Sequence, residues 1–292
     1  MAKQTRDKLY PVWEYIESNL EERFGLNQLA FFSNFSPWHF HRFFKKYQGE
    51  NIQSYIKRLR IEKAAYELKI SDFPILEIAM EAGYESNEAF TRAFKRYLGK
   101  TPSQFKADSK KIKTNIHITK SSSPTLIKGL NEKEFRLKEI SEFRIAYVRH
   151  IGPYSHLPGP IPDSVEVKTL IQFLNSIQSQ PKDHKWVGIS LDDPSISPEN
   201  KIRFDLGITI GANHFPTKQE LGIQTVSGGK YMQIRYRGGY KNLPSIYEFL
   251  LQEYIPIRKI RIKNSPPFEI YLNPMGGKSE EKITDIYIPI KS

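Results

Sequence analysis

The sequence predicts two domains of different class, an all-α domain with two helix-turn-helix motifs followed by an α+β domain with pseudo-two-fold symmetry. The chain has 292 residues, which is enough for two domains. An internal repeat in its first part lies among segments with helical periodicity. A second repeat, in its last part, lies where apolar residues recur with a period near two, as in strands. The two repeats therefore give a fold class for each part of the chain.

The first repeat has the pattern F-x-R-x-F-K-[KR]-Y-x-G, which begins at Phe40 and again at Phe90. Each copy follows a short apolar segment, residues 26–32 or 75–82, so each is expected to complete a helix-turn-helix. The second helix of each copy has a serine where an N-cap is expected and a glycine where a helix ends, at Ser36, Ser86, Gly49 and Gly99.

The helical domain is predicted to span residues 1–110. Within it, an amphipathic helix over residues 51–69 joins the two copies, and another over residues 7–22 precedes them. Residues 111–133 contain a Ser-Ser-Ser-Pro run and have the composition of a linker. The second domain is then predicted to cover residues 134–292.

The second repeat has the pattern R-x-x-G-x-Y-x-x-L-P, from Arg149 and from Arg235. An amphipathic helix, a strand and the closing pattern D-x-x-I-x-I follow each copy, and the closing pattern begins at Asp205 and at Asp285. Each half is therefore predicted as strand, helix, strand and strand, and an earlier strand is compatible with the sequence. The helices are expected over residues 163–179 and 243–254, and the strands after them over 187–191 and 269–272. A ligand site is expected in the groove between two such halves.

The doubled helix-turn-helix pattern indicates DNA binding. Such a motif places its second helix in the major groove, and successive groove segments lie roughly 34 Å apart. Arg can pair with guanine, Asn with adenine and Glu with cytosine, while Lys suits phosphates. The side chains expected to face DNA are Trp38, His41, Arg42 and Lys45 in the first copy and Asn87, Glu88, Thr91, Arg92 and Lys95 in the second. The alternative, that Arg42 and Arg92 are ordinary surface charges, stays open at this point.

Residues 7–106 resemble the AraC/XylS family of transcription regulators. The resemblance is carried by three motifs, Ser36-Pro-Trp-His-Phe-His-Arg42, Ile78-Ala-x-x-x-Gly83-Tyr84 and Thr101-Pro-Ser103. It implies sequence-specific binding to double-stranded promoter DNA. By resemblance alone, activation is favoured over repression. Base and backbone contacts are implied for Trp38, His41, Arg42, Thr91 and Arg92, with Asn87 and Glu88 beside them.

Residues 134–292 resemble the GyrI-like effector-binding domain, also called the multidrug-sensing domain. The matching motifs are Gly152-Pro-Tyr154, Gly188-Ile-Ser-Leu-Asp-Asp-Pro194, Gly238-Gly-Tyr240 and Pro267-Phe-Glu-Ile-Tyr271. The order of the two domains is similar to the Rob-type arrangement. The resemblance implies a fold with pseudo-two-fold symmetry and a small-molecule effector.

Glu269 is the candidate residue for effector binding. A carboxylate among aromatic residues is costly unless it is paired, and a flat cation would satisfy it with added cation–π attraction. The resemblance implies this role for Glu269, with Tyr147, Tyr154, Trp186 and Tyr271 as walls of the site. The structural alternative is an ion pair between Glu269 and either Arg149 or Arg235.

Two other functions remain open at the level of sequence. The second domain could be a surface that contacts a partner protein, such as RNA polymerase, and binds no ligand. It could also be a GyrI-like hydrolase in which Glu269 and Tyr154 act as general base and acid. The favoured interpretation is a regulator that is not an enzyme, with no catalytic residue, cofactor or metal. The histidines of its second part lack metal-ligand spacing, at His117, His150, His156, His184 and His214.

Composition limits these functions further. The net charge of +12 favours an anionic partner. However, residues 1–110 hold 18 basic and 14 acidic residues, so most of the excess lies outside the helical domain. The absence of Cys excludes disulfides and thiol chemistry. No apolar run approaches the ~18–20 residues of a membrane span, and charged residues interrupt the first 25 positions, so a cytoplasmic protein without a signal peptide is expected.

Overall fold

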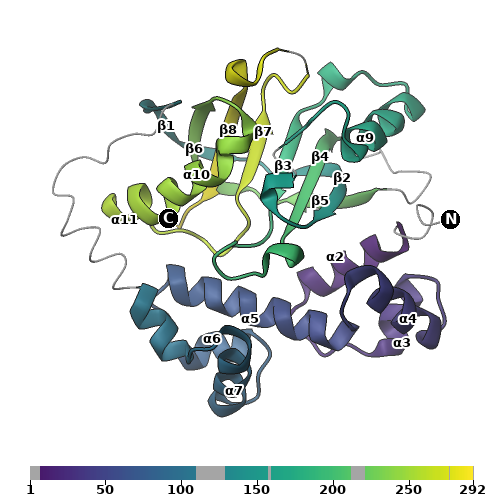
Figure 1. The fold of residues 1–292 in the computed structure, drawn as a ribbon, viewed down its shortest axis with the longest axis vertical. Coiled ribbons are helices and arrows are strands. Elements are labelled where there is room, and N and C mark those ends of the chain that lie inside the picture. The colour runs from purple at the N-terminus through teal and green to yellow at the C-terminus, as the bar shows by residue number, and fades with distance from the viewer. Residues whose placement is uncertain (1–6, 110–128, 157–158, 212–220, 276, 292) are drawn as a thin grey trace. The chain divides into compact units, whose positions relative to one another are not determined.

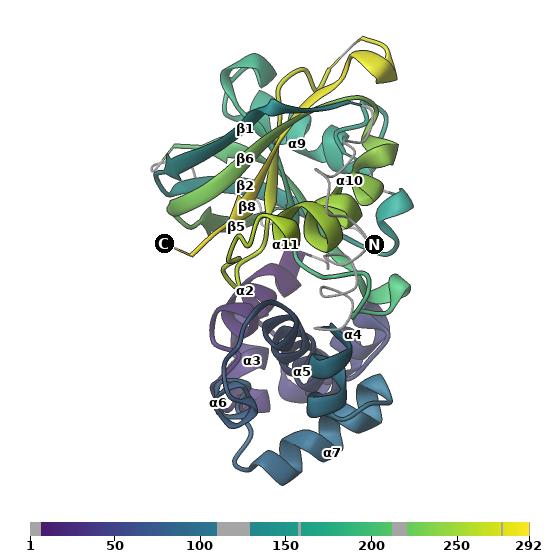
Figure 2. The ribbon, with the colours of Figure 1, turned by 90° about the vertical axis from the view of Figure 1, so that its left-hand side faces the viewer.

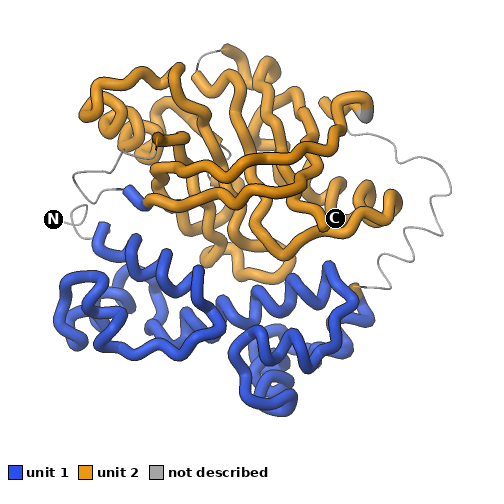
Figure 3. Tube along the Cα trace, turned by 180° about the vertical axis from the view of Figure 1, so that it is seen from behind, with its two compact units in different colours: residues 1–108, 217–222 blue, residues 109–216, 223–292 orange. Residues whose placement is uncertain are grey.

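The computed structural model describes residues 7–109, 129–156, 159–211, 221–275 and 277–291. The chain forms two compact units (Figure 3). Unit 1 comprises residues 1–108 and 217–222, and unit 2 comprises residues 109–216 and 223–292. Unit 1 is helical and unit 2 is built on a sheet, which confirms the predicted fold class.

Unit 1 contains two helix-turn-helix motifs, α3–α4 and α6–α7, with the long helix α5 between them (Figure 1). Its elements are η1 (Asp7–Leu9), α2 (Tyr10–Ser18), α3 (Leu26–Phe32), α4 (Pro37–Gln48), α5 (Ile52–Ile70), α6 (Ile75–Glu81) and α7 (Asn87–Leu98), followed by helical residues 102–109. α5 contacts α4 as well as α6 and α7. This arrangement makes α5 the connection between the two motifs.

The sequence signals at the ends of α4 and α7 are confirmed. The Ser36 and Ser86 hydroxyls accept hydrogen bonds from the backbone N–H three residues later, at 3.4 and 3.2 Å. Gly49 and Gly99 end the helices with φ of 69° and 74°, a conformation that favours glycine. The equivalent phenylalanines of each copy are buried beneath these helices, at Phe40, Phe44, Phe90 and Phe94.

Unit 2 contains one eight-stranded sheet in the order β1-β6-β8-β7-β3-β4-β2-β5. The strands are β1 (Leu130–Ile140), β2 (Phe143–Ile151), β3 (Trp186–Ser190), β4 (Arg203–Ile210), β5 (Gly222–Val226), β6 (Gly229–Arg237), β7 (Phe268–Tyr271) and β8 (Ile283–Pro289). β1 begins four residues before the predicted domain start at 134, and residues 111–128 of the predicted linker lie outside the described part of the chain.

The strand order shows the pseudo-two-fold symmetry directly, because β7 and β3 meet at the centre and equivalent strands follow on each side. The first strands of the two halves are exchanged: β1 pairs with β6 of the second half, and β5 lies beside β2 of the first. The helices α9 (Val165–Ser176) and α10 (Leu243–Phe249) cover the same face of the sheet, on either side of β3 and β7 (Figures 1 and 2). A π-helical turn (Leu250–Tyr254) and the short α11 (Ile255–Ile257) continue α10.

Main-chain contacts repeat between the halves of unit 2. The Gly152 N–H donates to the Ile202 carbonyl, and the Gly238 N–H donates to the Lys282 carbonyl, both at 2.9 Å. Each glycine precedes a short 3₁₀ turn, η2 (Tyr154–His156) or η5 (Tyr240–Asn242). Tyr154 and Tyr240 therefore occupy equivalent positions next to the central strands.

Candidate DNA interface and effector site

The predicted DNA-facing side chains lie largely on the outer faces of α4 and α7. In α4, Trp38 is 68% exposed, and the other three predicted residues of that helix are exposed as well. In α7, Thr91 is half-buried. The remaining predicted residues of that helix are exposed, namely Asn87, Glu88, Arg92 and Lys95. The amphipathic pattern therefore gave the orientation of both helices, whereas their DNA contacts remain predictions.

Arg42 and Trp38 form one unit at the start of α4. The Arg42 guanidinium carbon lies 4.5 Å from the centroid of the Trp38 ring, a cation–π contact between residues four apart. The stacking holds the guanidinium on an exposed aromatic surface and leaves its N–H groups available to a phosphate or a base edge. Sequence reasoning named both residues, and their spacing is the signal that could have predicted the contact.

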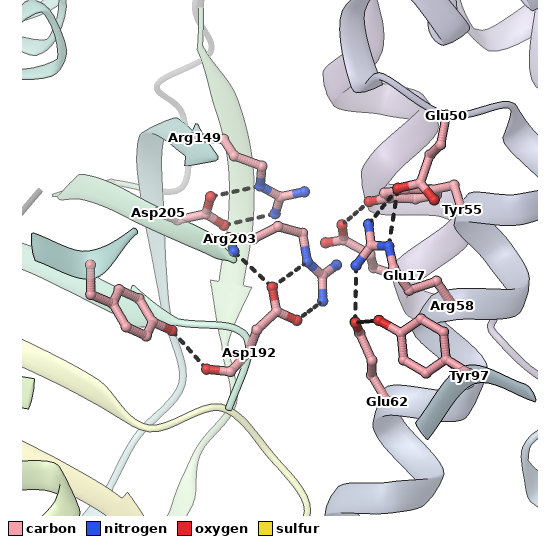
Figure 4. Close-up of polar contacts among 11 residues, drawn as sticks. Glu17, Glu50, Tyr55, Arg58, Glu62, Tyr97, Arg149, Asp192, Arg203 and Asp205 are labelled. Atoms are coloured by element: carbon pink, nitrogen blue, oxygen red, sulfur yellow. Dashed lines mark hydrogen bonds and ion pairs between the residues drawn. The ribbon is translucent and has the colours of Figure 1, made fainter. Parts of the chain in front are cut away.

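A buried polar network joins the elements of unit 1 (Figure 4). The Arg58 side chain in α5 donates to Glu62 at 2.9 Å and to Glu50 at 3.0 Å. Tyr97 of α7 donates to the other oxygen of Glu62, and Tyr55 donates to Glu17 of α2 at 3.0 Å. The network fixes α5 against the second recognition helix. Sequence reasoning missed it, because its partners are up to 38 residues apart.

Glu269 lies on β7, directly opposite Gly188 of β3 and Ile286 of β8. It is 2% exposed. The alternative prediction, an ion pair between Glu269 and Arg149 or Arg235, is wrong, because both arginines bind other carboxylates. Arg149 forms a bidentate pair with Asp205 at 2.8 Å (Figure 4), and Arg235 forms one with Asp285 at 2.7 Å.

Four tyrosines surround the Glu269 carboxyl. Tyr271 donates a hydrogen bond to it, and Tyr247 of α10 approaches it from the helix. The carboxylate raises the pKa values of all four phenols, in addition to the effect of burial, at Tyr154, Tyr240, Tyr247 and Tyr271. Burial raises the pKa of Glu269 to about 7, although the hydrogen bond from Tyr271 and the nearby Tyr247 phenol act in the opposite direction. Desolvation therefore outweighs the effect of the phenols.

The structure brings most of the predicted wall residues together. Trp186 pairs directly with Tyr271 across β3 and β7, so the two side chains share a face with Glu269. Tyr154 donates to the Asp192 carbonyl at 2.8 Å, and the Asp192 carboxylate binds the Arg203 guanidinium (Figure 4). This ion pair fixes the turn that holds Tyr154.

Tyr147 does not belong to this group. Glu269 pairs with Gly188, Gly188 pairs with Leu206, and Leu206 pairs with Val148. Paired residues share a face and neighbours along a strand alternate, so Tyr147 points to the opposite face of the sheet. The prediction that Tyr147 forms a wall of the Glu269 site is therefore corrected. Its ring instead lies 5.6 Å from the guanidinium carbon of Arg149 on that opposite face.

Sequence reasoning missed Tyr240 and Tyr247. Tyr240 is the repeat counterpart of Tyr154, so the R-x-x-G-x-Y pattern contained the signal for it. Tyr247 lies within a correctly predicted helix, but its rotation toward β7 had no signal in the sequence. Gly188 is a further feature of the site, since a Cβ there would overlap the Tyr271 hydroxyl and Phe204. The glycine gives the Tyr271 side chain its space beside Glu269.

Comparison with known proteins finds a family match for each of the two units. Residues 133–291 match the family described as the GyrI-like small molecule binding domain, which is more than half of the chain. The chain belongs to the GyrI-like family. Residues 29–108 match a family described as a helix-turn-helix domain. GyrI-like unit 2 is thus preceded by a helix-turn-helix unit, as the sequence predicts.

Relatives of the helical unit are transcription regulators of the AraC type. The chain is 33% identical to the multiple antibiotic resistance protein MarA of Salmonella typhimurium over 119 residues, which cover 40% of this chain and 89% of MarA. It is 38% identical over 95 residues to the transcriptional activator AarP of Providencia stuartii, covering 32% and 69%. It is 35% identical over 95 residues to the transcriptional regulator Rob of Salmonella typhimurium, covering 32% and 33%. The protein is a DNA-binding AraC-type transcription regulator with a GyrI-like small-molecule-binding domain.

Within the described part of this GyrI-like protein, no helix is long and apolar enough to cross a membrane. The same residues contain no cluster of three or more His, Asp or Glu side chains that could hold a metal ion.

Proposed function

We propose that the protein is a transcription activator controlled by a small cationic or lipophilic effector bound at Glu269. The observation that carries the proposal is the environment of this carboxyl, which is buried among neutral phenols and has no arginine partner among the described residues. A buried carboxylate in such surroundings lacks charge compensation. A bound cation would supply it.

The aromatic side chains support the same ligand class. Tyr240 and Tyr271 make an edge contact, with ring centroids 5.1 Å apart, and Trp186 lies directly opposite Tyr271. Aromatic rings attract a cation through their faces and also offer apolar area. A lipophilic cation therefore satisfies both the carboxylate and the rings.

On the DNA side, we propose that α4 and α7 enter successive major-groove segments of a promoter. Their exposed faces carry Arg, Asn, Glu and Lys, which suit base edges and phosphates. The activating sign is supported by the relative AarP, which is itself described as an activator. Effector binding would change the DNA affinity of unit 1, or its contact with RNA polymerase, by shifting a conformational equilibrium.

The effector proposal is tested by calorimetric titration of the full chain with methyltriphenylphosphonium and with triphenylphosphine oxide, a neutral molecule of similar size. The cation should bind more tightly, and Glu269→Gln should abolish this preference. Glu248→Gln, at an exposed site on α10, is the matched control and should leave it intact. A wider panel of aromatic cations extends the test. If none binds, unit 2 is better explained as a protein-interaction surface, and chemical conversion of a bound probe would indicate an enzyme.

The DNA proposal is tested by selecting binding sites from random duplexes. Two conserved elements about one helical turn apart are expected, since each recognition helix reads one groove segment. Selection of a single element, or of none, would contradict the two-site arrangement.

A further inference from the structure

The groups facing Glu269 from each neighbouring element are electrically neutral, and this is the basis of the inference. The phenols are Tyr271 on β7 itself, Tyr247 on α10, Tyr240 on η5 and Tyr154 on η2. The directly paired positions on β3 and β8 are Gly188 and Ile286. No acidic or basic side chain in this set shares the site with Glu269.

Three cationic side chains of unit 2 bind other groups. The Lys282 ammonium donates to the Asn273 and Pro274 carbonyls and lies 5.6 Å from the centroid of the Tyr240 ring. Arg149 and Arg235 each form two hydrogen bonds to an aspartate. Asp205 is next to Leu206, and Asp285 is next to Ile286, so by strand alternation both pairs lie on the opposite face from Glu269.

A carboxyl in these surroundings has two ways to avoid an uncompensated charge. It can bind a proton, or it can bind a cation. Solvation by water would be a third way, but Glu269 is only 2% exposed and has little access to water. The rise of its pKa to about 7 by burial agrees with the first way in the ligand-free protein.

We propose that a cationic effector and a proton compete for the Glu269 carboxyl, so that binding of one monocation releases the proton from Glu269 to the solvent. This inference rests on the proposed function, and it adds a defined charge class and a pH response. The O–H bond of the carboxyl breaks, its electron pair stays on the carboxylate, and the proton passes to buffer. The total charge of the site is unchanged by the exchange.

The exchange has a measurable consequence. Below the pKa of the carboxyl, each pH unit changes the apparent affinity for a monocation by about tenfold, and above it the affinity becomes constant. The surrounding phenols do not contribute in this range, because burial raises their pKa values above the ordinary value of 10. With a pKa of about 7, the dissociation constant for a monocation should fall about tenfold between pH 6 and pH 8.

The test uses the full chain and methyltriphenylphosphonium. Calorimetry at pH 6, 7 and 8, in pairs of buffers with different ionisation enthalpies, gives the number of protons released per bound cation. About one should be released at pH 6, about half of one at pH 7 and few at pH 8. Glu248→Gln should reproduce these values, and triphenylphosphine oxide should release none.

Two further measurements keep the inference falsifiable. Glu269→Gln should release no proton with any ligand that it still binds, which excludes the histidines as the source. If that variant binds nothing, infrared difference spectra of the wild-type protein should show the protonated-carboxyl band disappearing as the cation binds. Cation binding with no proton release and a pH-independent dissociation constant would overturn the exchange and leave effector binding standing. Absence of binding at every pH from 6 to 9 would overturn both.

Discussion

The two arginine–aspartate pairs of unit 2 give a stability prediction with an internal control. Arg149 and Asp205 are 1% and 0% exposed, and two hydrogen bonds of 2.8 Å join them across β2 and β4. Arg235 and Asp285 occupy equivalent positions on β6 and β8 with bonds of 2.7 Å, but the Arg235 side chain is 34% exposed. The same motif is thus present twice at different depths.

The depth sets the expected cost of Asp→Asn substitution. Asp205→Asn removes the negative charge to which the buried Arg149 guanidinium donates two hydrogen bonds, and breaking such a buried pair costs about 3–5 kcal/mol. Asp285→Asn leaves Arg235 accessible to water, which replaces part of the lost interaction, so a cost of about 1–2 kcal/mol is expected. Replacing both partners, as in Arg149→Met with Asp205→Leu, should recover most of the loss, because no uncompensated charge remains.

The assay is hydrogen exchange of the full chain as a function of urea, followed in peptides from β2, β4, β6 and β8. These peptides report the free energy of unfolding of unit 2 separately from that of unit 1. Equal losses for the two single variants, or a larger loss for Asp285→Asn, would refute the argument from burial. A double variant as unstable as Asp205→Asn would refute the argument from uncompensated charge.

Three further predictions concern the two sites. The pKa of Glu269 is raised from its ordinary 4.5 to about 7, so between these pH values the native state binds more protons than the unfolded state. The free energy of unfolding therefore falls as pH rises through this range. Glu269→Gln should remove this slope and should be about 3 kcal/mol more stable than the wild type in urea denaturation at pH 8. Arg92→Ala should lower the preference for a selected site over random DNA by about 1–3 kcal/mol in mobility-shift competition, whereas Lys95→Ala should weaken both equally. Gly188→Ala should displace the Tyr271 hydroxyl and lower the free energy of unfolding by about 1–3 kcal/mol. It should also weaken cation binding in calorimetric titration.

The helical unit was largely predictable because its signals are local. Ser36 and Gly49 delimit α4 in the structure as they do in the sequence, and Asn51 caps α5, whose predicted and observed ranges differ by one residue. Caps, glycine stops and a period near four all act within a few residues of the chain. The repeat then doubles each signal, so that one motif supports the other.

The effector site was predictable only in part, because strand parity and long-range pairing decide it. Tyr147 was assigned to the site by resemblance to the GyrI-like domain, but one step along a strand moves a side chain to the other face of the sheet. The exchange of β1 and β5 between the halves depends on pairings that no local pattern records. Arg149 and Arg235 were named as candidate partners of Glu269, but they pair with Asp205 and Asp285. Nothing in the sequence shows which of these carboxylates each guanidinium group binds.

The pseudo-symmetry of unit 2 also explains why its site carries a single carboxylate. Equivalent pairing to Leu206 and Ile286 makes Gly188 the counterpart of Glu269, and the two face each other across β3 and β7. A second glutamate at position 188 would place like charges directly opposite each other in a buried setting, which is strongly unfavourable. Neutral side chains have no such penalty, so Tyr154 and Tyr240 are retained in both halves. A duplicated fold can thus repeat its aromatic walls, while a carboxylate at the two facing central positions comes from one half alone.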